Sequence, residues 1–343
     1  MTRRGWVLGA LITLVCLALA ARQVDPQRLV AELSTVDPRF LVPGVLCTFI
    51  GYVVRTFRWR VILAASAQCS FPSLFGILMS GFAANNLLPA RLGELARAYL
   101  LGRQTGVRKT YSLASIFLER LFDGLVLVLL MSTISLFVDL PGWGREVELF
   151  AAFVFAGVGI AVIVVLARRD LASRLLGLLV RPAPPRIREW VLRAASTFLA
   201  GLESMRSPSV LANTALLSLV VWACEWASYC FISYGFHLDL EGAQRFVAMT
   251  LLLVVVNLGI MVPSSPGYVG TFQFFGVEAL KVFRVSPESA LAFTIVAHLT
   301  QYVLVTTIGV IALGRLGVSL RSLGSEARRD TGEPDDSNVE ATG

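Results

Sequence analysis

The residues from 85 to 97 combine polar side chains with two helix breakers in the order Asn-Asn-Leu-Leu-Pro-Ala-Arg-Leu-Gly-Glu-Leu-Ala-Arg. Pro89 removes a backbone donor and Gly93 permits a close backbone approach, so we expect a helix to break and restart here. A restarting helix presents free N–H groups and the positive end of its dipole, and both attract anions. Asn86 belongs to the polar lead-in of this predicted anion site.

Two arginines and one glutamate complete the stretch. Arg91 and Arg97 carry planar donors that suit phosphate oxygens. Glu94 lies three residues from each arginine and can hold one guanidinium group while the other meets a ligand. The alternative is a solvated loop with incidental ion pairs.

Three further charged residues interrupt a long apolar run. Glu119 and Asp123 are four residues apart and share a helix face, and Arg120 can reach Asp123 across three residues. A charge at mid-bilayer costs about 2.5–3.5 kcal/mol on insertion scales, so the trio should face the protein interior or a wet cavity. Its net negative charge leaves one carboxylate to pair with Arg91, Arg97, Arg55 or Arg58. A ligand-binding role and a purely structural pairing network both remain open.

A second break is predicted at Pro-Ser-Ser-Pro-Gly-Tyr-Val-Gly-Thr-Phe-Gln, residues 263–273. Its Pro, Gly and Ser residues exclude a regular helix, and the hydroxyls can satisfy the freed backbone groups. The candidate binding residues in it are Ser265, Pro266, Gly267, Gly270 and Gln273. A simple kink hinge is the alternative. In neighbouring spans, we expect His298 and Gln301 to make interhelical hydrogen bonds, and Glu225 to be an intramembrane acid that pairs with an arginine or carries a proton.

The composition determines the class of protein that these residues belong to. Of 343 residues, 56% are hydrophobic and 15% are charged. This charged fraction is too low for a water-soluble enzyme. The net charge of +7 comes from 28 Arg and 2 Lys against 23 acids, and in a membrane protein it points to cytoplasmic loops and anionic lipid rather than nucleic acid. No nucleotide-binding or hydrolase motif is present, and we expect no catalytic residue, metal or cofactor.

The elements that must position the candidate residues are transmembrane helices, so the predicted fold is an all-α polytopic membrane protein. About six full spans are expected, near residues 6–21, 40–65, 112–140, 149–166, 211–236 and 290–313. Two broken or re-entrant hairpins lie between them, near 71–103 and 246–282. Their opposite orientations would fit an inverted repeat with its binding site at the breaks. Eight ordinary spans would satisfy the same parity.

The positions of the positive charges orient the predicted chain in a cell (plasma) membrane. Arginine-rich loops place both termini in the cytoplasm by the positive-inside rule. Residues 1–21 are expected to be an uncleaved helix, although a signal peptide would also fit. Residues 1–318 form the predicted transmembrane domain, and residues 319–343 a disordered cytoplasmic tail.

With these motifs in view, the chain resembles the flippase-like transmembrane family, which includes the membrane half of bacterial lysylphosphatidylglycerol synthase/flippase proteins, the multiple peptide resistance factors. The resemblance covers residues 1 to about 318 and is carried by three motifs that stand here as Pro89-x-Arg91-x-Gly93-Glu94-x-x-Arg97, Glu119-Arg120-x-x-Asp123 and Ser265-Pro266-Gly267-x-x-Gly270-x-x-Gln273. The third motif departs from the family's S-P-G-G-x-G-x-x-E pattern, because Tyr268 replaces a glycine and Gln273 replaces the usual acid.

The resemblance implies a non-enzymatic translocator of a membrane phospholipid or lipid-linked head group. It does not imply lipid synthesis, because the 30 residues after Leu313 are too few for the separate synthase domain of two-part members. Two other hypotheses stay open: a membrane-embedded transferase that uses Glu119 and Asp123 on a polyprenyl- or phospholipid-linked substrate, and an accessory subunit of a partner synthase or glycosyltransferase. Anionic lipid head groups are further expected partners, and the oligomeric state is not predicted.

Overall fold

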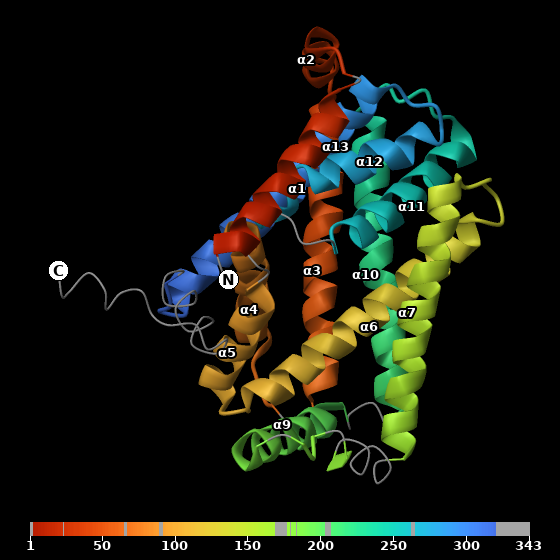
Figure 1. Cartoon of the computed structure of the whole chain (residues 1–343). Helices are drawn as coiled ribbons and strands as arrows, with labels where there is room; N and C mark the ends of the chain where they lie inside the picture. Colours follow the sequence, from red (N-terminus) through yellow and green to blue (C-terminus); the bar gives the residue numbers. More distant parts are fainter. Residues whose placement is uncertain are drawn as a thin grey trace. The chain divides into compact units, whose positions relative to one another are not determined.

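The computed structural model describes residues 3–22, 24–64, 67–88, 92–168, 177–178, 180–182, 184–202, 207–261 and 265–319. Within these ranges the chain is all-α, with twelve α-helices and two short 3-10 helices, η1 and η4 (Figure 1). In order, they are α1 Arg3–Ala21, α2 Pro26–Ser34, η1 Pro38–Phe40, α3 Leu41–Leu63, α4 Phe71–Leu87, α5 Gly93–Thr105, α6 Lys109–Ile134, α7 Gly142–Ala167, α9 Pro185–Leu202, α10 Pro208–Tyr234, α11 Gly242–Gly259, η4 Pro266–Tyr268, α12 Thr271–Lys281 and α13 Pro287–Arg315.

Local sequence signals explain where several helices begin. Asp25 accepts a hydrogen bond from the Gln27 N–H at 2.8 Å, and Pro26 occupies the first position of α2. Ser286 accepts from the Ser289 N–H at 3.1 Å, and Pro287 opens α13 in the same way. A capping oxygen satisfies a backbone donor that lacks an intrahelical partner, and proline needs no such donor.

Five helices of the described part are long and apolar enough to cross a membrane: Pro38–Leu63, Gly142–Ala167, Pro208–Tyr234, Gly242–Gly259 and Pro287–Arg315. Together with the all-α fold, they identify a membrane protein. Two of the six predicted full spans are not among them. Three charged residues interrupt α6, and the apolar stretch found in α1 is the shorter Leu11–Ala20. By contrast α11, predicted as half of a hairpin, has 18 residues, about 27 Å at 1.5 Å per residue.

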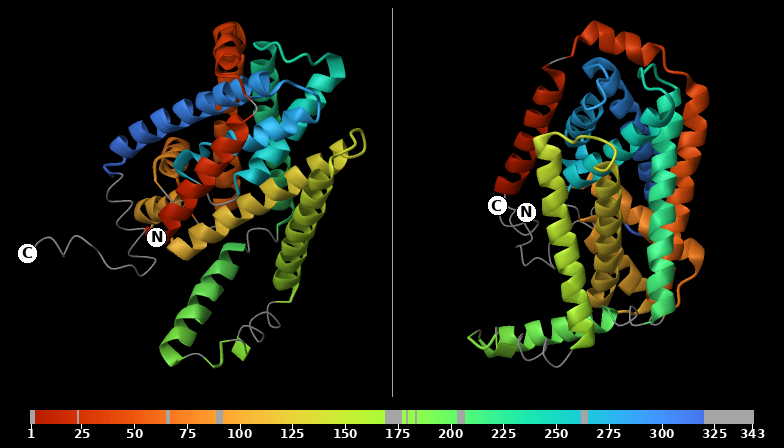
Figure 2. Two further views of the ribbon diagram at one scale, coloured as in Figure 1. Left: turned by 45° about the horizontal axis from the view of Figure 1, so that its top comes forward. Right: turned by 90° about the vertical axis from the view of Figure 1, so that its right-hand side faces the viewer.

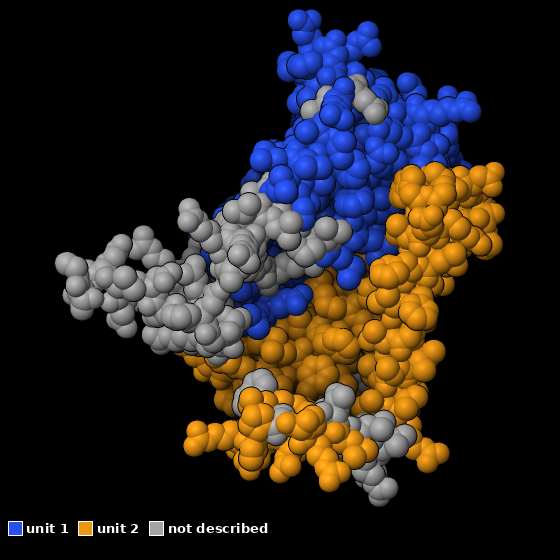
Figure 3. All heavy atoms as spheres, in the orientation of Figure 1, with its two compact units in different colours: residues 1–52, 75–97, 223–343 blue, residues 53–74, 98–222 orange. Residues whose placement is uncertain are grey.

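The chain forms two compact units, which Figure 3 colours separately. Unit 1 comprises residues 1–52, 75–97 and 223–343, and unit 2 comprises residues 53–74 and 98–222. In unit 1, α12 packs against α1, α11 and α13, and α13 also contacts α2. Its core contains a continuous buried run along α11 from Leu251 to Val256.

Unit 2 is built around α6, which packs against α7 and α9. One of its apolar clusters joins Ile62 of α3, Ala114 and Leu118 of α6 and Leu202 of α9. Helix α9 lies across the end of α7 rather than along it (Figures 1 and 2). This amphipathic helix lies between the predicted spans 149–166 and 211–236 and is an addition to the predicted elements.

Candidate functional site

The first break, between α4 and α5, lies where the sequence predicts it. Helix α4 ends at Leu87 and α5 begins at Gly93. The Gly93 N–H donates to Oδ1 of Asn85 at 2.8 Å, so the end of α4 caps the start of α5. One of the N–H groups expected to face an anion is therefore already used within the protein. Pro89 and Arg91 lie outside the described residues.

Glycines allow α4 and α5 to pack closely at this break. A Cβ atom on Gly93 would overlap the carbonyl oxygen of Gly81, and one on Gly81 would lie 2.7 Å from Cδ of Arg97. Arg97 is 2% exposed, with its aliphatic stem against Gly81. Glu94 is half-buried. A ligand of the Arg97 guanidinium group would therefore have to reach a buried side chain.

The second break, between α11 and α12, is also non-helical as predicted. Helix α11 ends at Gly259, and the turn η4 contains Gly267 with φ 69°, a left-handed conformation that glycine adopts at low cost. Ser265 precedes this turn, and Pro266 is its first residue. Helix α12 restarts at Thr271, where the Gly270 N–H donates to Oε1 of Gln273 at 2.7 Å. The side chain at the family's acidic position thus caps a helix here.

The two breaks meet on one face of α13 in unit 1. Nδ2 of Asn86 donates to Oγ1 of Thr306 at 2.9 Å, and the Tyr302 hydroxyl donates to the Asn86 carbonyl oxygen at 3.4 Å. A Cβ atom on Gly267 would lie 2.6 Å from Cε2 of Tyr302 and 3.2 Å from the Asn86 carbonyl oxygen. Nε2 of Gln273 lies 3.1 Å from Nδ1 of His298. No motif or spacing in the sequence predicted these contacts of Tyr302 and Thr306.

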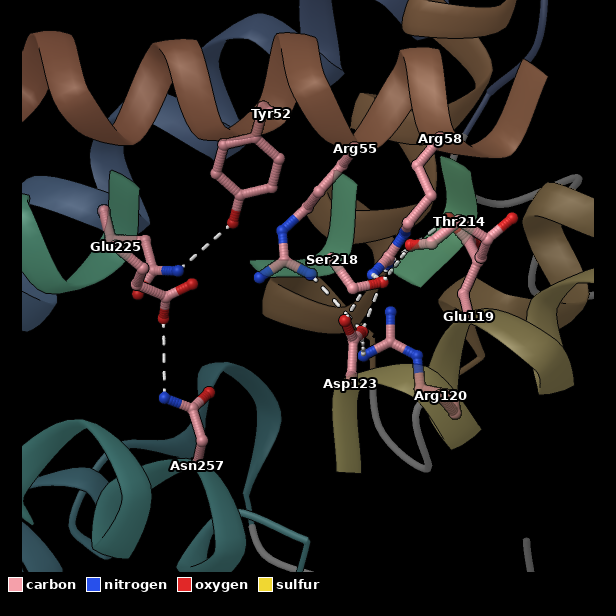
Figure 4. Close-up of polar contacts among 11 residues, drawn as sticks. Tyr52, Arg55, Arg58, Glu119, Arg120, Asp123, Thr214, Ser218, Glu225 and Asn257 are labelled. Atoms are coloured by element: carbon pink, nitrogen blue, oxygen red, sulfur yellow. Dashed lines mark hydrogen bonds and ion pairs between the residues drawn. The ribbon is translucent and has the colours of Figure 1, made fainter. Parts of the chain in front are cut away.

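Unit 2 holds the predicted trio within a network of charges from α3 and α6 (Figure 4). Oδ1 of Asp123 accepts from Nη1 of Arg58 at 2.5 Å, and its Oδ2 accepts from Nη2 of Arg58 at 3.3 Å and Nη1 of Arg55 at 3.4 Å. Nη1 of Arg120 lies 3.7 Å from Asp123, and Oε1 of Glu119 lies 3.6 Å from Nη2 of Arg58. Arg58 is 0% exposed, whereas the Arg120 side chain is 42% exposed.

Helix α10 completes this network with neutral groups. Oγ of Ser218 accepts from Nη1 of Arg58 at 2.9 Å and donates to the Thr214 carbonyl oxygen at 2.7 Å. The Arg55 guanidinium group stacks over the Trp222 ring at 5.3 Å from the centroid. Paired carboxylates, a hydroxyl and an aromatic face lower the cost of buried arginines inside membrane-spanning helices. The pairing of Asp123 with Arg55 and Arg58 is among the alternatives that the sequence offered.

The remaining polar residues that the sequence predicts to make contacts within the spans also have partners in unit 1. Nε2 of Gln301 donates to the Tyr52 hydroxyl at 3.2 Å, which confirms an interhelical hydrogen bond, and His298 makes one with Gln273. Nδ2 of Asn257 donates to Oε1 of Glu225 at 3.5 Å (Figure 4). Asn257 is thus one partner of Glu225, for which the sequence predicts an arginine or a proton-carrying role.

The three motifs are therefore distributed over both units. Residues of the first and third motifs belong to unit 1, and Glu119, Arg120 and Asp123 belong to unit 2. The predicted convergence of Arg97 with Glu119 and Asp123 stays a prediction. Among the residues that the structure describes, no group of three or more His, Cys, Asp or Glu side chains could hold a metal ion.

Interrupted helices, long apolar spans and charges paired within them define a polytopic α-helical membrane protein. The chain belongs to the lysylphosphatidylglycerol synthase TM region family, whose model matches residues 6–309. It is 26% identical to a UPF0104 membrane protein of Methanothermobacter thermautotrophicus, over 93% of this chain and 98% of the relative.

A second relative is longer than this chain. The chain is 25% identical to glycosyltransferase AglD of Haloferax volcanii, and the match covers 95% of this chain but 57% of that protein. A UPF0104 membrane protein of Methanocaldococcus jannaschii is 25% identical over 66% of this chain and 91% of the relative.

Proposed function

We propose that the protein translocates a membrane phospholipid, or a lipid-linked head group, between leaflets, and that it binds the anionic head group at its interrupted helices. The observation that carries this proposal is the meeting of the two breaks, where Asn86 approaches Gly267 and Tyr302. Non-helical backbone is tolerated at membrane depth only where protein or a cavity surrounds it. Transporters with repeated halves place substrate sites at such broken helices.

In the proposed membrane arrangement, six full spans enclose the two interrupted elements as an inverted repeat, with both termini in the cytoplasm of a plasma-membrane protein. Helix α11 is long enough to span alone, so the second element either crosses or re-enters. Cysteine accessibility at the two ends of α11 would distinguish these topologies.

The first and third motifs have roles in this proposal. The head-group phosphate contacts the first break near Pro89 and Gly93, with Arg91 and Arg97 as anion ligands. Glu94 positions these arginines. Residues 263–270 of the second break form the opposing gate.

Helix α9 supplies a surface for anionic lipid head groups. It lies across the end of α7, and its first turns expose Arg186, Ile187 and Arg188. An amphipathic helix with this composition binds the interface between head groups and acyl chains, where arginines meet lipid phosphates.

The proposal is tested in proteoliposomes that contain a head-group-labelled anionic phospholipid. Arg91→Ala and Arg97→Ala should each slow translocation roughly tenfold to hundredfold, because each removes a charged hydrogen-bond donor. The matched control is Arg145→Ala, since Arg145 on α7 is an arginine whose side chain is 61% exposed and pairs with Glu148 at 3.4 Å. Full translocation activity in both Arg91→Ala and Arg97→Ala, with correct folding, would remove these residues from the mechanism.

A membrane-embedded transferase is the second candidate, and the alignment with a protein named as a glycosyltransferase favours it. Glu119 and Asp123 would then serve as base or metal ligands, although Asp123 is held by Arg58 at 2.5 Å. A covalently altered lipid that forms only with a divalent metal would support this candidate. Activity that requires a co-purifying synthase or glycosyltransferase would instead indicate an accessory subunit.

A further inference from the structure

Three polar side chains form a single stripe along α13. His298, Tyr302 and Thr306 follow one another at intervals of four residues, which places them one above the other on the same face of a helix. Helix α13 runs without interruption from Pro287 to Arg315. The three residues therefore belong to one continuous helix, which fixes the spacing between them.

His298 contacts the second break. The Gly270 N–H can only donate, so the Gln273 atom that faces it at 2.7 Å is the amide oxygen. The amide nitrogen of Gln273 consequently faces His298 at 3.1 Å, and Nδ1 of the imidazole accepts. The ring also stacks on Phe272, with 4.4 Å between the ring centroids and 5° between the ring planes.

Thr306 and Tyr302 contact the first break. Oγ1 of Thr306 accepts from Nδ2 of Asn86 at 2.9 Å, near the C-terminal end of α4. Backbone carbonyls in the last turn of a helix lack intrahelical partners. Tyr302 supplies one such partner, since its hydroxyl lies 3.4 Å from the Asn86 carbonyl oxygen. The Tyr302 ring also touches Gly267, so it contacts both breaks.

We propose that His298, Tyr302 and Thr306 are positioning residues that couple the two breaks, so that each opens more readily when the other is released. Both breaks contact one continuous helix, and Tyr302 contacts both Asn86 and Gly267. Movement of either break away from α13 removes contacts that hold the other. Coupling of this kind is reciprocal, because a free-energy coupling acts equally in both directions.

The inference rests on the proposed function only for its consequence in transport, where the gate and the head-group site would open together. Its test needs no lipid substrate. Backbone amide hydrogen exchange is measured by mass spectrometry on the full chain in nanodiscs. The segments compared are residues 85–88, at the first break, and residues 265–272, at the second.

Thr306→Val and His298→Ala are the diagnostic variants, because among the described residues Thr306 contacts the first break and His298 contacts the second. We expect Thr306→Val to accelerate exchange at both breaks, by about fivefold at its own break for one lost hydrogen bond and by a measurable fraction of that at the other. His298→Ala should give the reciprocal pattern. His298→Asn replaces His298→Ala if the alanine variant does not fold.

Thr300→Val is the matched control on the same helix. The Thr300 hydroxyl donates to the Val296 carbonyl oxygen of its own helix at 2.7 Å, so its loss should change exchange at neither break. Acceleration confined to the break that the substituted residue contacts would overturn the coupling. Such a result would leave the translocation proposal standing, whereas unchanged translocation in the Arg97 variant would remove that proposal without affecting the exchange result.

Discussion

Asp123→Asn is the substitution that most sharply tests the charge network of unit 2. Asp123 accepts from Arg58 at 2.5 and 3.3 Å and from Arg55 at 3.4 Å, and Arg120 lies 3.7 Å away. Asparagine keeps the shape of the side chain but removes its charge. Arg58, which is 0% exposed, then loses its shortest ion pair in a place that water does not reach.

The expected loss of folding stability in Asp123→Asn follows from the burial of Arg58. Removing one partner of a buried ion pair costs about 3–5 kcal/mol, because an uncompensated charge is left behind. At roughly 2–4 °C per kcal/mol, the midpoint of thermal unfolding should fall by about 6–20 °C. The assay is the intrinsic tryptophan fluorescence of the purified full chain in one detergent during heating.

Glu148→Gln is the matched control for this measurement. Glu148 is also buried, at 7% exposure, and pairs with Arg145 at 3.4 Å. The two residues are three positions apart, as are Arg120 and Asp123. The Arg145 side chain is 61% exposed, so water can solvate it after the substitution, and the cost should stay below about 1 kcal/mol. An Asp123→Asn midpoint equal to that of Glu148→Gln would refute the stabilising role of the network.

The same variant separates the two roles left open for the second motif. A structural network predicts that folded Asp123→Asn protein keeps its translocation rate per molecule. A role in ligand binding predicts that the rate falls even where the protein is folded.

Two further predictions concern packing and the membrane surface. Gly93→Ala should destabilise the α4–α5 contact by about 1–3 kcal/mol through overlap with Gly81, whereas Gly157→Ala, with nothing within 4 Å of its new Cβ atom, should not destabilise; thermal unfolding midpoints check both. Arg186→Glu combined with Arg188→Glu should lower the number of anionic phospholipids retained on purification without changing the number of zwitterionic ones, and equal retention of both lipid classes in variant and wild type would contradict the assignment of α9.

The helix breaks were predictable from the sequence because their causes are local. Proline lacks a backbone donor, and glycine permits a close backbone approach or a positive φ, so these residue types predict a break regardless of what surrounds them. The pairing of Asp123 with an arginine was predictable for a different reason, since an unpaired charge within a span is costly and few cations are available.

The meeting of the two breaks was not predictable in this way. No spacing in the sequence relates Asn86 to Thr306, because the contact depends on how α4 and α13 pack. The capping of Gly93 by Asn85 likewise depends on packing, in this case of α4 against α5. Helix α9 was overlooked because its arginines give residues 168–207 the composition of a solvated loop, although its apolar residues have helical periodicity.

The central claim is that an anionic head group binds at the interrupted helices. Native mass spectrometry of the gently solubilised wild-type chain and of the Arg97→Ala variant tests it most directly. The account predicts a phosphate-bearing lipid that stays bound to the wild type and is lost from Arg97→Ala, while Arg145→Ala retains it. The same lipid retained equally by all three proteins, or no bound lipid in the wild type, would contradict the claim.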